Sequence, residues 1–248
     1  MIWGTFTATH FATLAAAAAM LIILYFGMKR MPLWAQTTVL GILSFSGIAA
    51  IVYNLVTWGA PLEYLPLHLC SINALLLPVA VLTRNKTMCN LLLVWCLGAL
   101  AALVLNHDMT NAVLFDLPFC FFYFPHVLEF GIPLLMFGLG HVKKDPKCIL
   151  STMGITAGIY TLVHFANLWI NAYCLENSIS YDGGATIVHV NYMFSLDPTN
   201  PLLALFHSIL PGQYWYMYLV FPIILVYLLA VYSPELIRLL KSRKAAVK

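Results

Sequence analysis

Long apolar stretches separated by short polar connections dominate the pattern of this chain. Seven of them approach or exceed the roughly 20 mostly apolar residues that a membrane-spanning helix needs. They cover residues 8–28, 34–58, 66–83, 88–105, 119–140, 148–172 and 213–233. The pattern therefore predicts an all-α, polytopic membrane bundle of seven transmembrane helices, in a single domain over residues 1–248.

A shorter apolar stretch lies in the long connection between the last two predicted spans. This connection, residues 174–212, contains PLLALFHSILPG at 201–212, which is too short to cross a membrane. We expect an outer loop with a short helix there, lying in the membrane interface or re-entering the membrane.

The basic residues give the predicted orientation. All 12 lie on one side of the predicted bundle, at Lys29, Arg30, Arg84, Lys86, Lys143, Lys144, Lys147, Arg238, Lys241, Arg243, Lys244 and Lys248. The positive-inside rule makes this side cytoplasmic, so the amino terminus is predicted outside and the carboxyl terminus inside. The net charge of +3 is then a topology signal, and we expect no nucleic-acid partner.

Composition excludes several classes of protein and site. Only 8% of the residues are charged, against about 25% in a soluble domain. The six cysteines contain no C-x-x-C pair, so neither a zinc ribbon nor a disulfide framework is indicated, although Cys120 and Cys174 share the outer side. No glycine-rich phosphate-binding loop is present. We therefore expect no cofactor and no metal site.

The stretch LPLHLCSIN, residues 65–73, places polar groups inside the third predicted span. Pro66 suits the first turn of a helix, which puts His68 and Cys70 near its outer end. Cys70 and Asn73, three residues apart, share a helical face, whereas His68 and Cys70 do not. Ionisable groups at such depth usually face a bundle interior or a wet cavity, so this stretch is a candidate functional site.

The fifth predicted span carries a second polar pair. His126 and Glu129 are three residues apart and therefore neighbours on one helical face. Glu129 is the only carboxylate inside any predicted span, and in hydrocarbon it must be protonated or paired. The pair is either functional or a structural buried pair, and the sequence leaves both interpretations open.

Further polar residues lie in the outer halves of the other spans. His164, Asn167 and Asn171 form a stripe on the sixth span, and such a stripe either lines a site or joins helices. Asn54 lies near the outer end of the second span, and Asn191 lies in the outer connection. These positions predict a substrate-binding cavity that opens to the outer leaflet, lined mainly by spans three, five and six.

These residue types suggest thiol catalysis. A cysteine needs a neighbouring base or cation to become a nucleophile near neutral pH. Cys70, His126 and Glu129 supply a nucleophile, a base and a carboxylate to orient the base, provided that the third and fifth spans pack together. Nearby amides would stabilise an oxyanion. The candidates for this role are Asn73, Asn54 and Asn167.

Two rival functions remain open. His68, His107, His126 and His164 could gather around zinc in a lipid hydrolase, although no H-x-x-x-H or H-E-x-x-H pair is present. A compact bundle with a polar interior would also suit a non-enzymatic substrate-binding or transport subunit. A deep, acyl-chain-sized groove would favour the enzyme, and a closed polar pocket would favour transport.

Four motifs carry a resemblance over most of the chain: LPLHLC, LTRNK, FPHVLEFGIPLL and VNYMF. With them the chain resembles the YwaF-type bacterial integral membrane proteins. It is more distantly similar to the eukaryotic transmembrane protein 164, a cysteine-dependent phospholipid acyltransferase, and to the androgen-induced fatty-acid-ester hydrolases. The resemblance implies a multi-pass protein of the bacterial plasma membrane.

The resemblance also implies acyl transfer or ester cleavage on a membrane phospholipid, with the family histidine at His126. In the eukaryotic enzyme the cysteine directly precedes a histidine, which corresponds here to Leu67, whereas Cys70 follows His68. Either Cys70 takes over from about one turn deeper, or His68 and His126 bind a ligand or act as general acid and base on water. We expect a lipid acyltransferase or transacylase that forms a thioester on Cys70, with donor, acceptor and any homo-oligomer left open.

Overall fold

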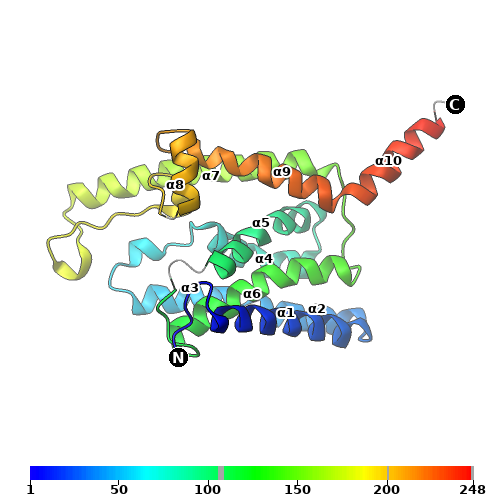
Figure 1. Ribbon diagram of the computed structural model, residues 1–248, viewed down its shortest axis with the longest axis horizontal. Helices are drawn as coiled ribbons and strands as arrows, with labels where there is room; N and C mark the ends of the chain where they lie inside the picture. The colour runs from blue at the N-terminus through cyan, green and yellow to red at the C-terminus, as the bar shows by residue number, and fades with distance from the viewer. Residues whose placement is uncertain (106–108, 200, 247–248) are drawn as a thin grey trace. The chain divides into compact units, whose positions relative to one another are not determined.

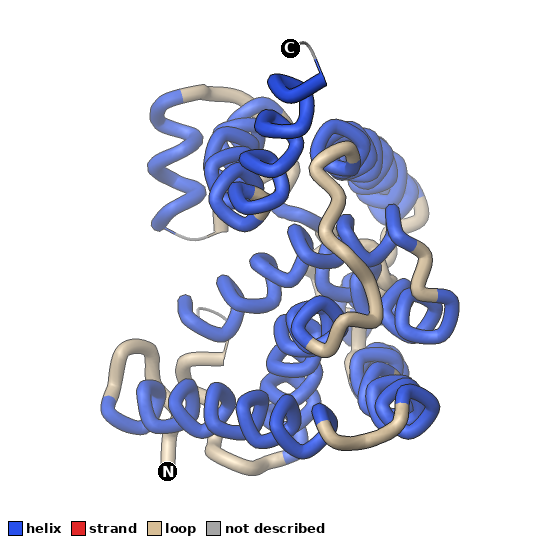
Figure 2. Tube along the Cα trace, turned by 90° about the vertical axis from the view of Figure 1, so that its right-hand side faces the viewer, coloured by secondary structure: helices blue, strands red, loops and turns tan. Residues whose placement is uncertain are grey.

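The computed structural model describes residues 1–105, 109–199 and 201–246. These residues form helices joined by loops, with two isolated β-bridges and no strand (Figure 2). The α-helices are α1 (Ala8–Lys29), α2 (Leu33–Ser44), α3 (Ser46–Thr57), α4 (Leu69–Thr83), α5 (Lys86–Leu105), α6 (Leu117–Gly138), α7 (Cys148–Glu176), α8 (Pro201–Ile209), α9 (Val220–Val231) and α10 (Ser233–Ala246). The 3-10 helices are η1 (Pro61–Tyr64), η2 (Tyr181–Gly183), η3 (Tyr192–Phe194) and η4 (Trp215–Leu219). The predicted all-α fold is confirmed.

Contacts divide the chain into two compact units. The first comprises Met1–Val142 and the second Lys143–Lys248. The single domain over residues 1–248 stays a prediction. None of the six cysteines is in a disulfide.

Among the described residues, five helical stretches are long and apolar enough to cross a membrane. They are α1, the pair α2 and α3 as one stretch over Leu33–Thr57, α5, α6 and α7. A sixth is obtained if Trp215–Val231 and Ser233–Ser242, which meet at a bend of 64°, count as one span. The chain is therefore a multi-pass membrane protein, while the count of seven and the orientation of the termini stay predictions.

The third predicted span is shorter than the sequence pattern suggested. The helix begins at Leu69 rather than near Pro66, because η1 occupies Pro61–Tyr64 and His68 is an extended N-cap residue. Its 15 residues extend about 22 Å at 1.5 Å per residue. This is less than the thickness of a bilayer core, roughly 30 Å. The amino-terminal end of α4 lies within the first unit, beside the middle of α6.

Helix α6 is the central element of the first unit and contacts α1, α2, α3, α4 and α5 (Figure 1). Small residues allow these close approaches, which drive helix association in lipid. Gly131 of α6 packs against Leu21 of α1, and Gly47 of α3 packs against Ala74 of α4. About 61% of the apolar window of α6 is buried inside the structure, against 11% for α1. Polar residues on α6 are thus enclosed by protein, whereas α1 is peripheral.

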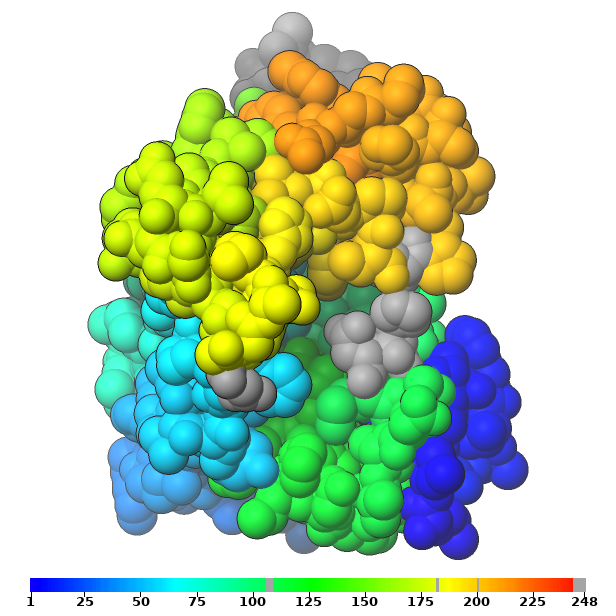
Figure 3. Space-filling model, turned by 90° about the vertical axis from the view of Figure 1, so that its left-hand side faces the viewer, coloured from blue at the N-terminus to red at the C-terminus, as the bar shows by residue number. Residues whose placement is uncertain are grey.

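The amino-terminal end of α6 is held by aromatic packing. Asp116 caps the helix by accepting a hydrogen bond from the Phe119 backbone N–H at 2.8 Å. The buried Trp3 packs edge-on against Phe119 and Tyr123, and the rings of Tyr53 and Phe121 stack at 4.2 Å. The connection that follows α3, cyan in Figure 3, lies on the face shown there, with Trp58 exposed and Ala60 buried. These contacts fix the position of α6 relative to the end of α3.

The second unit is built on the long helix α7. The connection that follows α7 folds back against it through η3, and α8 packs against η4 through Leu203, Phe206 and Tyr216 (Figure 1). The predicted short helix of the outer connection is present as α8, Pro201–Ile209. Its exposed face carries Leu202 and Leu205. Its place in the membrane interface stays a prediction.

Candidate active site

The structure brings together the thiol, imidazole and carboxylate that the sequence singled out. Cys70 is the second residue of α4, and His126 and Glu129 lie in the middle of α6. Cys70 Sγ, a ring nitrogen of His126 and a carboxylate oxygen of Glu129 all lie within 4.8 Å of one another. The condition set by the sequence, that the third and fifth predicted spans pack side by side, is met by α4 and α6.

His126 is oriented by its own helix. Nδ1 lies 2.6 Å from the backbone carbonyl of Phe122, and the two rings pack with centroids 4.4 Å apart. In the neutral imidazole this contact makes Nδ1 the donor, so the lone pair is on Nε2. The sequence hypothesis gave the orienting role to Glu129, whereas in the structure the Phe122 carbonyl holds the ring. Glu129 is left as a neighbouring acid or charge.

Glu129 is enclosed without a conventional partner. Its side chain is 4% exposed, and within the described residues Oε2 makes no hydrogen bond. Its Oε1 faces Gly47 of α3, where an added Cβ would lie 3.0 Å away. A buried carboxylate without compensation is costly. Burial of this group therefore opposes stability unless it is protonated or gains a partner.

Asn73 adds a second unsatisfied group at the same place. It is fully buried, lies three residues after Cys70 on α4 and neighbours the Glu129 carboxylate. The Asn73 amide is close enough to interact with the Glu129 carboxylate as a weak donor, but neither amide atom of Asn73 makes a hydrogen bond of normal geometry within the described part of the chain. Buried polar atoms are normally paired. Asn73 and Glu129 therefore both present free hydrogen-bonding capacity to the Cys70 region.

His68 and Asn54 lie outside this cluster. His68 is the N-cap residue of α4 and is partly buried. Asn54 is seven residues after Gly47 on α3, which is about 10 Å along the helix axis from the point that faces Glu129. The structure does not bring Asn54 to the carboxylate, and its contact with substrate stays a prediction.

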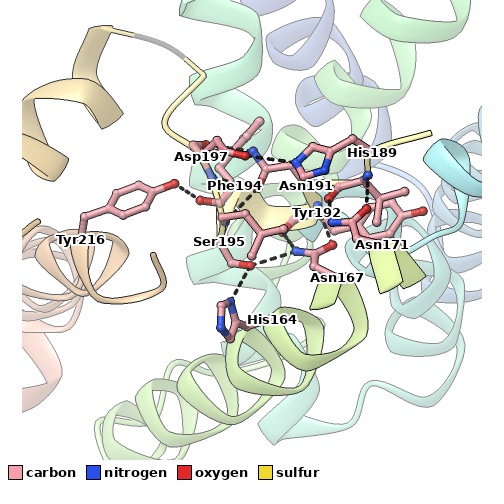
Figure 4. Close-up of polar contacts among 12 residues, drawn as sticks. His164, Asn167, Asn171, His189, Asn191, Tyr192, Phe194, Ser195, Asp197 and Tyr216 are labelled. Atoms are coloured by element: carbon pink, nitrogen blue, oxygen red, sulfur yellow. Dashed lines mark hydrogen bonds and ion pairs between the residues drawn. The ribbon is translucent and has the colours of Figure 1, made fainter. Parts of the chain in front are cut away.

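The polar stripe on α7 belongs to the second unit, where it holds the outer connection (Figure 4). Asn167 is fully buried; it donates to the Tyr192 carbonyl at 2.8 Å and the Ser195 hydroxyl at 2.9 Å, and accepts from the Tyr192 N–H at 2.9 Å. His164 Nδ1 lies 3.0 Å from the Ser195 hydroxyl. Asn171 pairs with both backbone groups of Val190. Of the two functions left open for this stripe, the observed contacts are those of a helix joining a loop.

Asn191 also makes hydrogen bonds to the backbone of the connection that follows α7. Its amide donates to the Asp197 carbonyl at 2.8 Å and accepts from the Leu196 N–H at 3.0 Å. The observed bonds of His164, Asn167 and Asn191 are therefore made within the second unit. Their predicted contact with substrate stays a prediction.

The sequence of the chain matches one family. The family model described as the TMEM164 family matches residues 5–233, which cover most of each unit. The chain belongs to the TMEM164 family. No curated protein and no solved structure matches this family member. The predicted relation to transmembrane protein 164 is confirmed, while the YwaF-type and ester-hydrolase resemblances stay predictions.

The four-histidine zinc site suggested by the sequence is not assembled in what the structure describes of this family member. His107 lies outside the described residues, and His164 belongs to the second unit. His68 is absent from the cluster formed by His126. Of the three of these histidines that the structure describes, His126 is the one that lies beside other side chains able to bind a metal, namely Cys70 and Glu129.

Three contributors were missed by sequence reasoning. Gly47 approaches the Glu129 carboxylate, and the Phe122 carbonyl orients His126. The Ser195 hydroxyl forms hydrogen bonds with Asn167 and His164. The i to i+4 spacing of Phe122 and His126 could have revealed the second of these contacts. Gly47 and Ser195 carry no local signal, because their roles depend on residues distant in the sequence.

Proposed function

We propose that this member of the TMEM164 family is a membrane phospholipid acyltransferase or transacylase that forms a thioester on Cys70. The observation that carries the proposal is the meeting of Cys70 Sγ, a His126 ring nitrogen and a Glu129 oxygen within 4.8 Å inside the first unit. A nucleophile next to a base, with the base oriented by a third group, is the general arrangement of covalent catalysis. Here the third group is the Phe122 carbonyl.

The first half-reaction transfers an acyl chain from a phospholipid ester to the thiol. Cys70 Sγ attacks the ester carbonyl carbon while Nε2 of His126 takes the thiol proton. The tetrahedral intermediate then collapses, the ester C–O bond breaks, and His126 returns the proton to the departing lysophospholipid oxygen. The products are a thioester on Cys70 and a lysophospholipid.

The second half-reaction passes the acyl chain to an acceptor hydroxyl or amine. The acceptor attacks the thioester carbonyl while His126 takes its proton, and the C–S bond breaks. His126 then reprotonates the Cys70 thiolate, which restores the starting state. With water as the acceptor the same steps give ester hydrolysis.

Glu129 and Asn73 support both half-reactions. A carboxylate close to His126 stabilises the imidazolium that forms when the ring takes a proton. The Asn73 amide, buried and without a hydrogen-bond partner in the described residues, is a pre-organised donor for the oxyanion of the tetrahedral intermediate. The amino-terminal end of α4, which carries Cys70, also favours developing negative charge.

Intact-protein mass spectrometry after brief incubation with phospholipid tests this proposal. We expect an adduct of one acyl chain that hydroxylamine removes, absent from Cys70→Ala and retained in Cys96→Ala, which removes a different thiol of the first unit. His126→Ala should slow adduct formation by about 100-fold or more. If the folded wild-type protein forms no adduct, thiol acyl transfer is wrong, and a ligand-binding subunit becomes the function to test.

A further inference from the structure

We propose that the cluster of Cys70, His126 and Glu129 binds one Zn²⁺ ion, and that this ion reversibly switches off thiol chemistry at the site. The inhibitory consequence rests on the proposed function, whereas binding of the ion does not. The sequence favoured no metal site, and its zinc alternative used four histidines rather than this cluster, because its motifs lack the short spacings of zinc proteins. The three ligand types meet only through the packing of α4 against α6.

The donor set selects zinc among common divalent ions. Thiolate, imidazole and carboxylate are the three side-chain ligands that Zn²⁺ uses in proteins. Mg²⁺ and Ca²⁺ prefer oxygen ligands and disfavour a site with sulfur and nitrogen. The cluster offers one sulfur, one nitrogen and one carboxylate oxygen, so zinc is the ion of best fit.

The charges also balance in a membrane interior. Glu129 is 4% exposed, and no cationic side chain of the described residues forms an ion pair with it. Zn²⁺ binding releases the protons of the Cys70 thiol and the Glu129 carboxyl group to water, and the resulting thiolate and carboxylate together cancel the charge of the ion. The complex is neutral overall, which avoids the cost of burying a net charge in apolar surroundings.

The surroundings of His126 match those of a metal ligand. A metal-bound histidine usually donates its second ring N–H to a carbonyl or carboxylate, which fixes the tautomer and the ring orientation. His126 Nδ1 makes this contact with the Phe122 carbonyl at 2.6 Å. Nε2 is then the nitrogen available to an ion, without any change of tautomer.

Unsatisfied buried atoms next to the cluster give independent support. Within the described residues, Oε2 of Glu129 and both amide atoms of Asn73 have no hydrogen-bond partner. A bound ion would engage Glu129 directly. A water in the fourth position could donate to Oδ1 of Asn73, so the ion and its water would satisfy groups that protein contacts leave open.

The required movement is small. In a tetrahedral complex with bonds of about 2.0–2.3 Å, neighbouring ligand atoms are roughly 3.3–3.8 Å apart. The three ligand atoms are now within 4.8 Å of one another, so side-chain rotations that draw them together by about 1.5 Å at most create the site. Three protein ligands leave a fourth position for water. The coordinated Cys70 thiolate can then no longer attack an ester.

Metal binding is measured on the full-length protein in detergent after treatment with a chelator. Zn²⁺ alone is added, and bound metal is determined after gel filtration. We expect one Zn²⁺ per chain, and at least tenfold weaker binding in Cys70→Ala, His126→Ala and Glu129→Gln. Cys96 is a buried thiol of the same unit that lies outside the cluster. The Cys96→Ala variant should therefore bind Zn²⁺ as tightly as the wild type does. Zinc binding that is absent, or unchanged in all three cluster variants, would overturn the proposal.

Co²⁺ provides a readout that does not depend on activity. A cobalt complex with Cys70 should show a thiolate-to-cobalt charge-transfer band that disappears in Cys70→Ala, while Cys70→Ser keeps the size of the side chain and should also lose it. Gel-filtration profiles establish that the variants are folded. A band retained in Cys70→Ala would place the ion elsewhere and contradict the proposed ligands.

The switch is tested by repeating the acyl-adduct experiment with Zn²⁺ present. We expect adduct formation to fall at least tenfold and to recover on addition of chelator. If zinc binds but the metal-free protein forms no adduct, the metal site stands and the proposed function fails. If the metal-free protein forms the adduct but binds no zinc, the proposed function stands and the zinc inference fails.

Discussion

Gly47 of α3 stands directly against the Glu129 carboxylate of α6. A Cβ added at Gly47 would lie 3.0 Å from Oε1 of Glu129 and 2.5 Å from Cβ of Ala74 on α4. The three helices that form the site therefore converge at one residue without a side chain. Among the described residues of the first unit Glu129 is the one buried acid, and its position depends on this close approach.

Gly47→Ala should displace α3 or the Glu129 side chain. We expect a destabilisation of about 1–3 kcal/mol from overpacking, and a loss of Cys70 acyl-adduct formation larger than the loss of stability explains. Thermal unfolding and adduct mass spectrometry on the same sample measure both. Gly27→Ala is the matched control, because nothing lies within 4 Å of its added Cβ. Equal behaviour of the two variants would show that Gly47 does not position the site.

Asn73→Leu separates catalysis from stability. Replacing a buried amide that lacks hydrogen bonds by an apolar side chain of similar size is neutral or stabilising, because an unpaired buried polar group is costly. If Asn73 stabilises the oxyanion, adduct formation should fall by about 100-fold. The melting temperature should stay the same or rise. Unchanged adduct formation would rule out the oxyanion role, and a large loss of stability would indicate that the amide has a structural partner.

Asn167→Ala should loosen the outer connection of the second unit. The substitution leaves the Tyr192 backbone and the Ser195 hydroxyl without their buried partner, at a cost of about 2–4 kcal/mol. Hydrogen exchange of residues 190–197 should accelerate accordingly. Asn177→Ala, which removes an exposed amide bonded to the Tyr173 carbonyl of α7, should leave that exchange unchanged. Identical exchange in both variants would contradict the anchoring role.

The stability of the protein should depend on pH through His141, which lies beyond the end of α6 and has a lowered pKa. Its Nε2 lies 2.7 Å from Oε1 of Gln36, and burial, reinforced by the Arg84 guanidinium, lowers the pKa of His141 from its usual 6.5. The folded protein binds this proton less readily than the unfolded chain does. The stability contributed is therefore fully present above about pH 6.5 and is lost as the pH falls through the lowered pKa.

Thermal unfolding between about pH 5 and pH 8 tests this dependence. The wild type should lose more stability than His141→Asn as the pH falls, because the asparagine cannot take up the proton. Parallel pH profiles would show that His141 does not carry the effect.

Much of the local structure was available from the sequence. The apolar runs predicted α1, the stretch formed by α2 and α3, and α5 to α7 to within a few residues, because hydrophobicity and capping act locally. The shared face of His126 and Glu129 followed from helical periodicity alone. The sequence pattern overestimated α4, because it could not show that η1 and the extended His68 delay the start of that helix.

By itself, then, the sequence determined that this chain is a helical, multi-pass membrane protein, and which side chains share a helical face. Only the tertiary structure decided that Cys70 meets His126 and Glu129, that Gly47 admits the carboxylate, and that Asn167 holds a loop. The reason is physical: periodicity encodes the faces of single helices, but all helices in lipid are similarly apolar, so hydrophobicity does not select their partners. That selection comes from close packing at residues such as Gly47 and Ala74, which no local pattern reveals.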